Sequence, residues 1–284
     1  MKKNIEQHFV VSFFVLFVLP CCFLIADSQD DANTKQLVRI YKTIEDTIRL
    51  KAHINLPHGY KENSMCPVFV FFHGGGWFQG QPENGIRMCN YWAQRGMVSI
   101  SFEYRLANSK DVTPAECIKD AKSAIRWVRS HAIMLGIDPC KIVATGGSAG
   151  GHLAVSTAIL EGFEETNEDT SISSSPDAVV AWSAAVNVAE DNWFVQLLGD
   201  RADAQDCSPA HHVRPDLPPM ALLHGTEDTT VPYRTVKQFA DDMQEAGNRC
   251  ELHTYENGDH IFHVKNRTHV LGVMEAFLIS LNCL

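Results

Sequence analysis

The stretch Gly146-Gly147-Ser148-Ala149-Gly150-Gly151 constrains this chain most, because it places one hydroxyl between glycines directly after the mostly apolar residues 141–145. A strand that turns at once into a helix forces the turn residue into a strained backbone conformation, and small neighbours let the two elements approach. The G-x-S-x-G pattern therefore predicts a nucleophile elbow that exposes Ser148 above a sheet. The helix expected over residues 149–160 points its positive N-terminal end at that oxygen, with the backbone N–H of Ala149 as the first donor.

A second glycine motif lies upstream, where His73-Gly74-Gly75-Gly76-Trp77 follows the continuously apolar residues 68–72. Glycines after a buried strand let backbone N–H groups turn toward a ligand with no side chains in the way. A strand that ends in H-G-G-G upstream of a G-x-S-x-G elbow is far more specific than either motif alone. We therefore predict an oxyanion hole formed by the N–H groups of Gly75, Gly76 and Ala149.

Two kinds of apolar pattern indicate how the strands are arranged. Residues 68–72 and much of 98–102 are continuously apolar, as in strands that helices cover on both faces. Residues 48–56 alternate apolar with polar side chains, which is typical of a strand with one wet face, and we expect them in an edge hairpin. The sequence thus predicts an α/β fold with a mostly parallel central sheet and helices on both faces.

The segments between the predicted strands are short enough to be single helices or loops. Thr113, Pro114 and Glu116 form a capping box that starts a helix, which we expect to end at Gly136. The acidic, Ser- and Thr-rich residues 161–177 show no helical stripe and are predicted to form an exposed loop rather than a lid. No segment has the length of a large cap domain, so residues 27–284 are predicted to form one catalytic domain.

A carboxylate and a histidine follow the last two predicted strands. The first of these strands ends in His224-Gly225-Thr226-Glu227-Asp228, so Asp228 lies at a strand's C-terminal end, where open α/β sheets place functional groups. His260 comes directly after the final strand. The order Ser148, Asp228, His260 is the one found in α/β-hydrolases. His263 is a second candidate for the general base, although packing is the commoner role for a histidine in that place.

These motifs together resemble those of α/β-hydrolase esterases of the hormone-sensitive-lipase group, and most closely the compact bacterial feruloyl and acetylxylan esterases. The resemblance covers nearly everything after Leu37. Besides the two glycine motifs it includes Ser208 to Val213, His224 to Pro232 and Tyr255 to Phe262. The chain departs from the family at Ile261, where glycine usually follows the histidine.

The resemblance implies a serine carboxylesterase that hydrolyses short-chain acyl or aryl esters, including acetyl or feruloyl esters of plant polysaccharide. Ser148 would attack the ester, His260 would act as general base and Asp228 would orient the imidazole. No metal or organic cofactor is implied. Two other classes share some of these features. A prolyl-oligopeptidase-like serine peptidase shares the H-G-x-x-D-x-x-V-P turn, and a small-molecule receptor on the same fold would be expected to lose a triad residue.

The N-terminus and the net charge bear on where the protein acts. Lys2 and Lys3 precede an apolar run over residues 9–26, so residues 1–26 are predicted to be a signal peptide of a secreted or periplasmic protein. An uncleaved membrane anchor is the alternative. The chain has 24 Lys and Arg against 34 Asp and Glu, and its formal charge of -10 would repel nucleic acid and anionic membranes. The expected partner is a small-molecule or polysaccharide-linked ester.

Cysteine and histidine spacing argues against disulfides and metals. Neither His211-His212 nor the pair His260 and His263 has acidic or thiol partners at ligand spacing, so no metal site is predicted. The seven cysteines after the leader show no C-x-x-C pair and no regular framework, and we expect buried free thiols. They are Cys66, Cys89, Cys117, Cys140, Cys207, Cys250 and Cys283.

Overall fold

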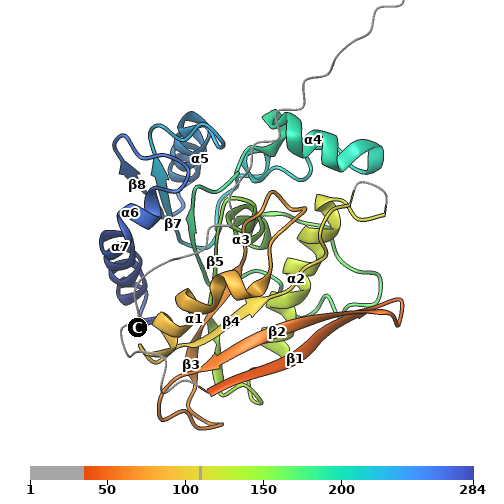
Figure 1. Cartoon of the computed structure of the whole chain (residues 1–284), viewed down its shortest axis with the longest axis vertical. Helices are drawn as coiled ribbons and strands as arrows, with labels where there is room; N and C mark the ends of the chain where they lie inside the picture. Colours follow the sequence, from red (N-terminus) through yellow and green to blue (C-terminus); the bar gives the residue numbers. More distant parts are fainter. Residues whose placement is uncertain (1–34, 109–110) are drawn as a thin grey trace, which may run out of the picture.

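The computed structural model describes residues 35–108 and 111–284, so the leader predicted over residues 1–26 lies outside the described residues. An eight-stranded sheet with the order β1-β2-β4-β3-β5-β6-β7-β8 forms the centre of the molecule (Figure 1). The strands are β1 (Lys35–Ile44), β2 (Ile48–Leu56), β3 (Cys66–Phe72), β4 (Val98–Phe102), β5 (Ile137–Gly147), β6 (Ala178–Trp182), β7 (Met220–Gly225) and β8 (Cys250–Tyr255). The β1–β2 and β2–β4 pairs are antiparallel, and every other neighbouring pair is parallel. The predicted parallel core with an edge hairpin is confirmed.

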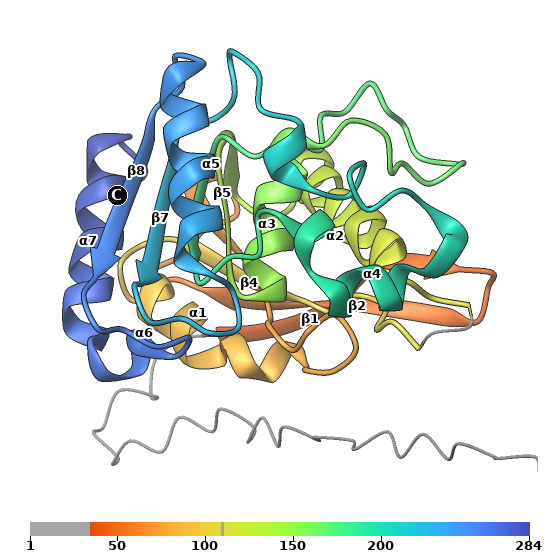
Figure 2. The same ribbon diagram turned by 90° about the horizontal axis from the view of Figure 1, so that it is seen from above.

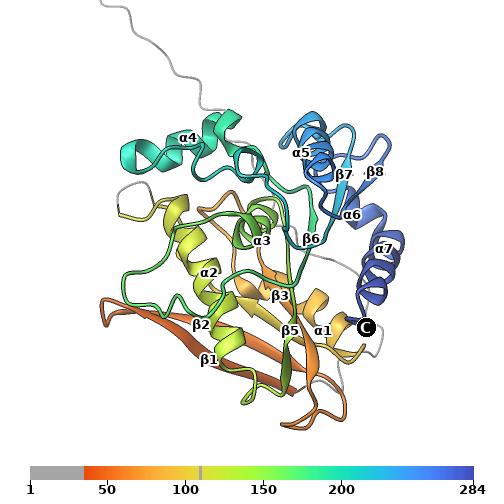
Figure 3. The same cartoon turned by 180° about the vertical axis from the view of Figure 1, so that it is seen from behind.

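Helices cover both faces of the sheet. In Figures 2 and 3, α2, α3 and α5 lie on one face, while α1 and α7 lie on the other. The α-helices are α1 (Ile86–Ala93), α2 (Pro114–Ser130), α3 (Ala149–Ile159), α4 (Asn192–Leu198), α5 (Tyr233–Glu245), α6 (Phe262–Lys265) and α7 (Arg267–Ser280). Short 3₁₀ turns occupy Pro82–Gly85, Val188–Glu190, Gly199–Arg201 and Pro209–His211.

Strand β3 shows why its sequence is continuously apolar. Val70 and Phe72 pack into the cluster that includes residues of α2, α3 and α5, whereas Phe69 and Phe71 pack with residues of α1 and α7. Successive side chains of a strand point to opposite faces, so a strand buried on both faces needs apolar residues at every position. The apolar run therefore follows from two separate cores.

The capping box at the start of α2 is present as predicted. Thr113 accepts a hydrogen bond from the N–H of Ala115, and the N–H of Thr113 donates to a carboxylate oxygen of Glu116 over 2.7 Å. The predicted end at Gly136 is wrong, because the helix ends at Ser130 and residues 131–136 form turns. At this point the His131 ring stacks on Trp127 and its Nδ1 lies 2.9 Å from that residue's carbonyl oxygen.

The loop over residues 161–177 is less exposed than predicted, because its acidic side chains cover cations of α2. Glu164 pairs with Lys122 and Arg126, at 2.7 Å in each case. The side chains of Lys122 and Arg126 are nearly buried, and a buried cation needs a counter-charge or hydrogen-bond acceptor. Burial tends to raise the pKa of Glu164, but these two cations more than offset it and hold that pKa below its usual range. The segment is therefore a docked loop.

All seven cysteines after the leader are free thiols, and five of them are buried. The prediction of burial is wrong for Cys140, which is exposed, and for Cys66, which is half-buried. The ladder between β3 and β5 is irregular here, so Cys140 lies outside the paired part of the strand. Burial raises the pKa of Cys89, Cys207 and Cys250 to about 12, which leaves these thiols protonated and unreactive near neutral pH.

Candidate active site

Ser148 lies at a sharp turn between the end of β5 and the start of α3. Its backbone has φ 55° and ψ -125°, a conformation that a residue with a Cβ rarely adopts. The turn has no room for larger neighbours, because a Cβ at Gly150 would lie 2.1 Å from the carbonyl oxygen of Phe72. A Cβ at Gly147 would lie 2.2 Å from the indole nitrogen of Trp182. The glycines of the motif thus allow the strained turn that leaves Ser148 partly exposed.

The predicted oxyanion loop lies beside this serine. The Cβ position of Gly74 is 3.6 Å from the Cβ of Ser148, so the two loops are in contact. Gly75 and Gly76 have φ of +128° and +58°, which only glycine adopts readily. Within the described residues, no protein group accepts a hydrogen bond from either N–H. These donors are therefore available to a ligand, as is the N–H of Ala149 in the first turn of α3.

Asp228 and His260 form a hydrogen-bonded pair. His260 Nδ1 donates to Asp228 Oδ2 over 2.7 Å, and the carboxylate side chain is fully buried. Asp228 Oδ1 accepts from the N–H groups of Thr230 and Val231, each over 2.9 Å. Burial alone would raise the pKa of Asp228. Hydrogen bonds from His224, His260 and the backbone more than offset this and hold that pKa well below its usual range, so the carboxylate is ionised.

A hydrogen bond also ties His260 to the strand next to the elbow. Ser183 Oγ donates to the backbone carbonyl oxygen of His260 over 2.9 Å. Ser183 directly follows β6, whose Trp182 pairs with Gly147 and accepts from the N–H of Ser148 over 3.1 Å. The predicted nucleophile, carboxylate and histidine thus come from the C-terminal ends of β5, β7 and β8. The predicted oxyanion donors lie at the same edge of the sheet.

His263 has different surroundings. It lies on the short helix α6, and its ring packs against Trp182 with 5.7 Å between the ring centroids. Burial, with a smaller contribution from the nearby His260, lowers the pKa of His263 to about 4. The carboxylate of Asp228 bonds to His260 instead. The geometry therefore favours His260 over His263 as the proton acceptor.

An exposed aromatic pair flanks the oxyanion loop, and the sequence reasoning missed it. Phe78 and Trp193 meet edge to face with 5.2 Å between ring centroids, and they are 42% and 45% exposed. Trp193 Nε1 donates to the carbonyl oxygen of Gly76 over 3.4 Å. Asp191 caps the N-terminus of α4, and buried Phe194 packs on Trp77. In the sequence only Phe78 adjoins a motif, the glycine loop, and no pattern there places Trp193 beside it.

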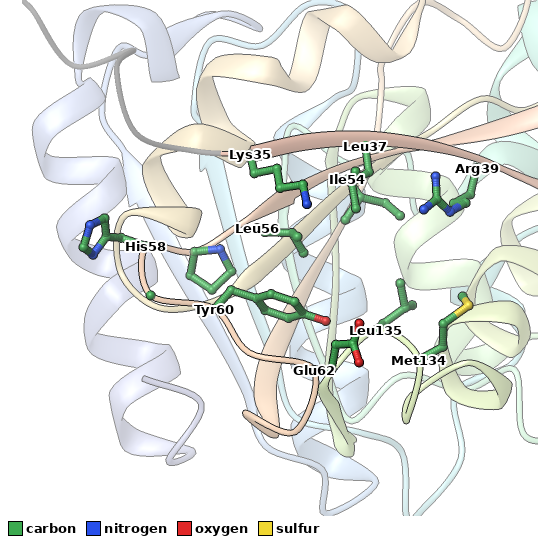
Figure 4. Close-up of a pocket in the computed structure, with 12 residues that line it drawn as sticks. Lys35, Leu37, Arg39, Ile54, Leu56, His58, Tyr60, Glu62, Met134 and Leu135 are labelled. Atoms are coloured by element: carbon green, nitrogen blue, oxygen red, sulfur yellow. The ribbon is translucent and has the colours of Figure 1, made fainter.

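A separate hollow of about 470 Å³ lies far from these residues (Figure 4). It is lined by β1, by the end of β2, by the loop that leads into β3 and by Met134 and Leu135, which precede β5. These segments mark the N-terminal ends of the parallel strands, opposite the edge that carries Ser148. The hollow contains none of the predicted site residues and is not part of the candidate active site.

Between residues 35 and 284, leaving out 109–110, no three His, Cys, Asp or Glu side chains gather as metal ligands would. None of the helices in this part of the chain has the length and apolar character needed to cross a bilayer.

Comparison with known proteins places this fold and site in a family. The BD-FAE family model matches residues 53–243, a span that includes the glycine loop, the elbow and the loop of Asp228. The chain belongs to the BD-FAE family of α/β-hydrolase esterases. The solved structure of the apo form of Thermogutta terrifontis esterase 2 is similar, with a TM-score of 0.84 and 39% identity over 88% of this chain and 96% of that one.

Two curated relatives of this BD-FAE member carry the name of an esterase or ester hydrolase. A probable isoprenylcysteine alpha-carbonyl methylesterase of Arabidopsis thaliana is 28% identical over 68% of this chain and 45% of its own length. The probable carboxylic ester hydrolase LipM of Mycobacterium tuberculosis is 30% identical over 65% of this chain and 46% of its own. The chain thus spans about half the length of the curated relatives it matches. Thermogutta terrifontis esterase 2 is also known in butyrate-bound and propionate-bound forms and phosphorylated by paraoxon.

Proposed function

We propose that this protein is a serine carboxylesterase. The observation that carries the proposal is the hydrogen bond between Asp228 and His260 at the same edge of the sheet as the elbow of Ser148. A serine hydroxyl is a weak nucleophile at neutral pH and needs a base that an acid partner orients. The Asp228 bond to Nδ1 fixes the tautomer of His260 and leaves its Nε2 without a hydrogen, ready to accept one.

The reaction would proceed through an acyl-enzyme. His260 Nε2 takes the hydroxyl proton as Ser148 Oγ bonds to the ester carbonyl carbon, and the carbonyl oxygen becomes an oxyanion. The N–H groups of Gly75, Gly76 and Ala149 bind this oxyanion. The intermediate collapses as the protonated His260 gives its proton to the departing alcohol. Water then attacks the acyl-enzyme by the same sequence of proton transfers and releases the acid.

Two features support a short acyl group and an accepted aromatic ring. Within residues 35–108 and 111–284 no large cap covers the site, and α4 is a helix of only 7 residues, so this part of the chain offers little to enclose a long acyl chain. The butyrate and propionate complexes of Thermogutta terrifontis esterase 2 show that such acids bind a similar fold. Phe78 and Trp193 offer exposed rings next to the oxyanion loop, which suits aryl or feruloyl esters.

The two other functional classes have less support. A receptor on this fold would be expected to lose a catalytic side chain, whereas this chain retains all three. A peptidase of the prolyl oligopeptidase type would share the Asp228 loop, but the H-G-G-G loop is typical of esterases.

We further propose that the protein is exported, on the basis of the signal-like residues 1–26, with membrane anchoring as the alternative.

Replacement of the nucleophile tests the function directly. We expect Ser148→Ala to reduce turnover of p-nitrophenyl acetate by on the order of a millionfold, while circular dichroism stays native. Paraoxon should label the wild type but not the variant. Retention of more than a few percent of activity in Ser148→Ala would assign the nucleophile elsewhere.

The wild type should hydrolyse p-nitrophenyl esters of acetate and butyrate faster than the octanoate ester.

A further inference from the structure

The carboxylate of Asp228 contacts a second imidazole. His224 is fully buried near the end of β7, and its Nε2 lies 3.3 Å from Asp228 Oδ2 and 2.9 Å from the carbonyl oxygen of Val231. The same Oδ2 atom accepts the hydrogen bond from His260 Nδ1. One imidazole from β7 and one from the turn after β8 thus lie against one carboxylate oxygen, and the mechanism above uses only the second.

The surroundings of His224 fix where its hydrogen lies. Both neighbours of Nε2, the Val231 carbonyl and the Asp228 carboxylate, are hydrogen-bond acceptors, so Nε2 must carry a hydrogen. In the described part of the chain, the buried Nδ1 atom has no hydrogen-bond partner. A hydrogen on Nδ1 would be buried without an acceptor, which is costly. The geometry therefore selects the tautomer with hydrogen on Nε2 only.

This donor differs from the other groups that hold Asp228. The N–H groups of Thr230 and Val231 bond to Oδ1 and belong to the same short loop as the carboxylate. His224 belongs to β7, which is paired with β6 on one side and β8 on the other. Its contact therefore fixes Oδ2 relative to the sheet, and the turn that follows β8 leads to His260.

We propose that His224 is a positioning residue: its Nε2–H bonds to the Val231 carbonyl oxygen and lies 3.3 Å from Asp228 Oδ2, and these two contacts hold the carboxylate in place to receive the hydrogen bond of His260. This inference rests on the proposed esterase function. Because the donor carries no net charge in this tautomer, it stabilises the carboxylate without neutralising it. Asp228 thus keeps its charge for the imidazolium that forms when His260 takes the proton of Ser148.

Few other ionisable groups face this pair of histidines. Tyr233, at the start of α5, has its ring centroid 6.1 Å from that of His224. His263 and Asp259 lie on the segment beyond β8 that also carries His260, and they interact electrostatically with each other. A substitution at His224 leaves these groups in place, so a change in the pH profile would report the loss of the contact with Asp228.

Two substitutions separate hydrogen bonding from packing. His224→Leu removes the donor, and we expect kcat to fall about 10- to 100-fold with KM within about threefold of wild type. A carboxylate without this N–H beside it interacts more strongly with the protonated ring of His260, so the acid limb of kcat/KM should move to higher pH. His224→Gln places an amide N–H near the position of Nε2 and should recover most of kcat. Val128→Ala, in the buried face of α2, controls for lost stability alone.

The inference is overturned if His224→Leu is less stable but keeps the kcat and pH profile of the wild type. If that variant does not fold, ¹⁵N NMR of the wild-type histidines decides. We expect His224 to show hydrogen on Nε2 between pH 6 and 8, and a hydrogen on Nδ1 would refute the proposed contact. Failure of the proposed function is distinguishable, because it would leave the wild type without esterase activity whatever the tautomer of His224.

Discussion

His260 and His263 lie three residues apart and are both candidates for the general base, yet their side chains have different surroundings. The imidazole of His260 bonds to a buried carboxylate and remains 23% exposed. The ring of His263 packs on Trp182, and burial lowers its pKa to about 4. A general base has to reach the substrate and return its proton, and the hydrogen bond from His260 to the buried carboxylate of Asp228 orients its ring for this.

We expect the two alanine variants to differ strongly in turnover. His260→Ala should lose at least about a thousandfold in kcat on p-nitrophenyl acetate, because the base is removed, whereas His263→Ala should lose at most about tenfold through looser packing. Steady-state kinetics on both proteins, with circular dichroism as the control for folding, makes the comparison. The opposite ranking would assign the base to His263.

The sequence predicted the chemistry of single residues where the signal was local. Ser148 and the oxyanion glycines each lie within a short sequence motif. Asp228 and His260 were predicted because each follows a predicted strand and because their order after Ser148 is the one found in α/β-hydrolases. The contact of His224 with Asp228 was not predictable, because it depends on how the turn after β7 folds back. The side chain of Ile261, where the family usually has glycine, is 45% exposed.

At the scale of elements, α4 and the loop after β3 together form an aromatic wall, the exposed pair Phe78 and Trp193, next to Gly76. Phe78 follows the glycine motif, whereas Trp193 lies more than a hundred residues later in the sequence, and their rings meet only in the folded chain. A capping Asp191 and the buried Phe194 hold α4 in place. Large aromatic rings that stay exposed at a site rim are positioned to receive apolar parts of a substrate.

We expect Phe78→Ala and Trp193→Ala each to lower kcat/KM for methyl ferulate and phenyl acetate by roughly 3- to 10-fold, the loss of one aromatic contact. Hydrolysis of ethyl acetate should change by less than about threefold. Val195→Ala on the same helix is a matched control, because Val195 is 41% exposed but makes no ring contact. Equal losses on aromatic and aliphatic esters would show that the wall supports the oxyanion loop rather than the substrate.

The elements themselves were predictable to different degrees. The capping box of α2 is a three-residue signal, and the helix starts where the signal places it. The end of α2 and the docking of residues 161–177 depend on contacts between distant segments, such as Lys122 with Glu164. Charge composition alone marked this segment as solvent-exposed, because the cations that it covers lie on another element.

At the scale of the whole molecule, removal from water lowers the pKa of three histidines, of which two are buried and one is half-buried. Burial lowers the pKa of His73, His152 and His263 to about 4. His152 accepts from Trp77 Nε1 and bonds to the carbonyl oxygen of Cys207, whereas His73 contacts Tyr104. Each ring is therefore held neutral in the folded protein at a pH where an unfolded histidine takes up a proton.

This linkage predicts that the protein loses stability in mild acid. Between about pH 6.5 and 4 the unfolded chain binds more protons than the folded chain, so the free energy of unfolding falls as the pH falls through this range. Each of the three histidines should lower the free energy of unfolding by about 2 kcal/mol between pH 7.5 and 5. Urea unfolding monitored by tryptophan fluorescence at the two pH values measures the total.

A variant series separates the histidine contribution from that of the carboxylates. His263→Ala removes one of the three groups, and its loss of stability between pH 7.5 and 5 should be about 2 kcal/mol smaller than that of the wild type. His58→Gln, at an exposed position, should leave the loss unchanged. Because ordinary carboxylates titrate near pH 4, they change little above pH 5. A wild-type free energy of unfolding that stays constant from pH 7.5 to 5 would contradict the neutral buried state of these histidines.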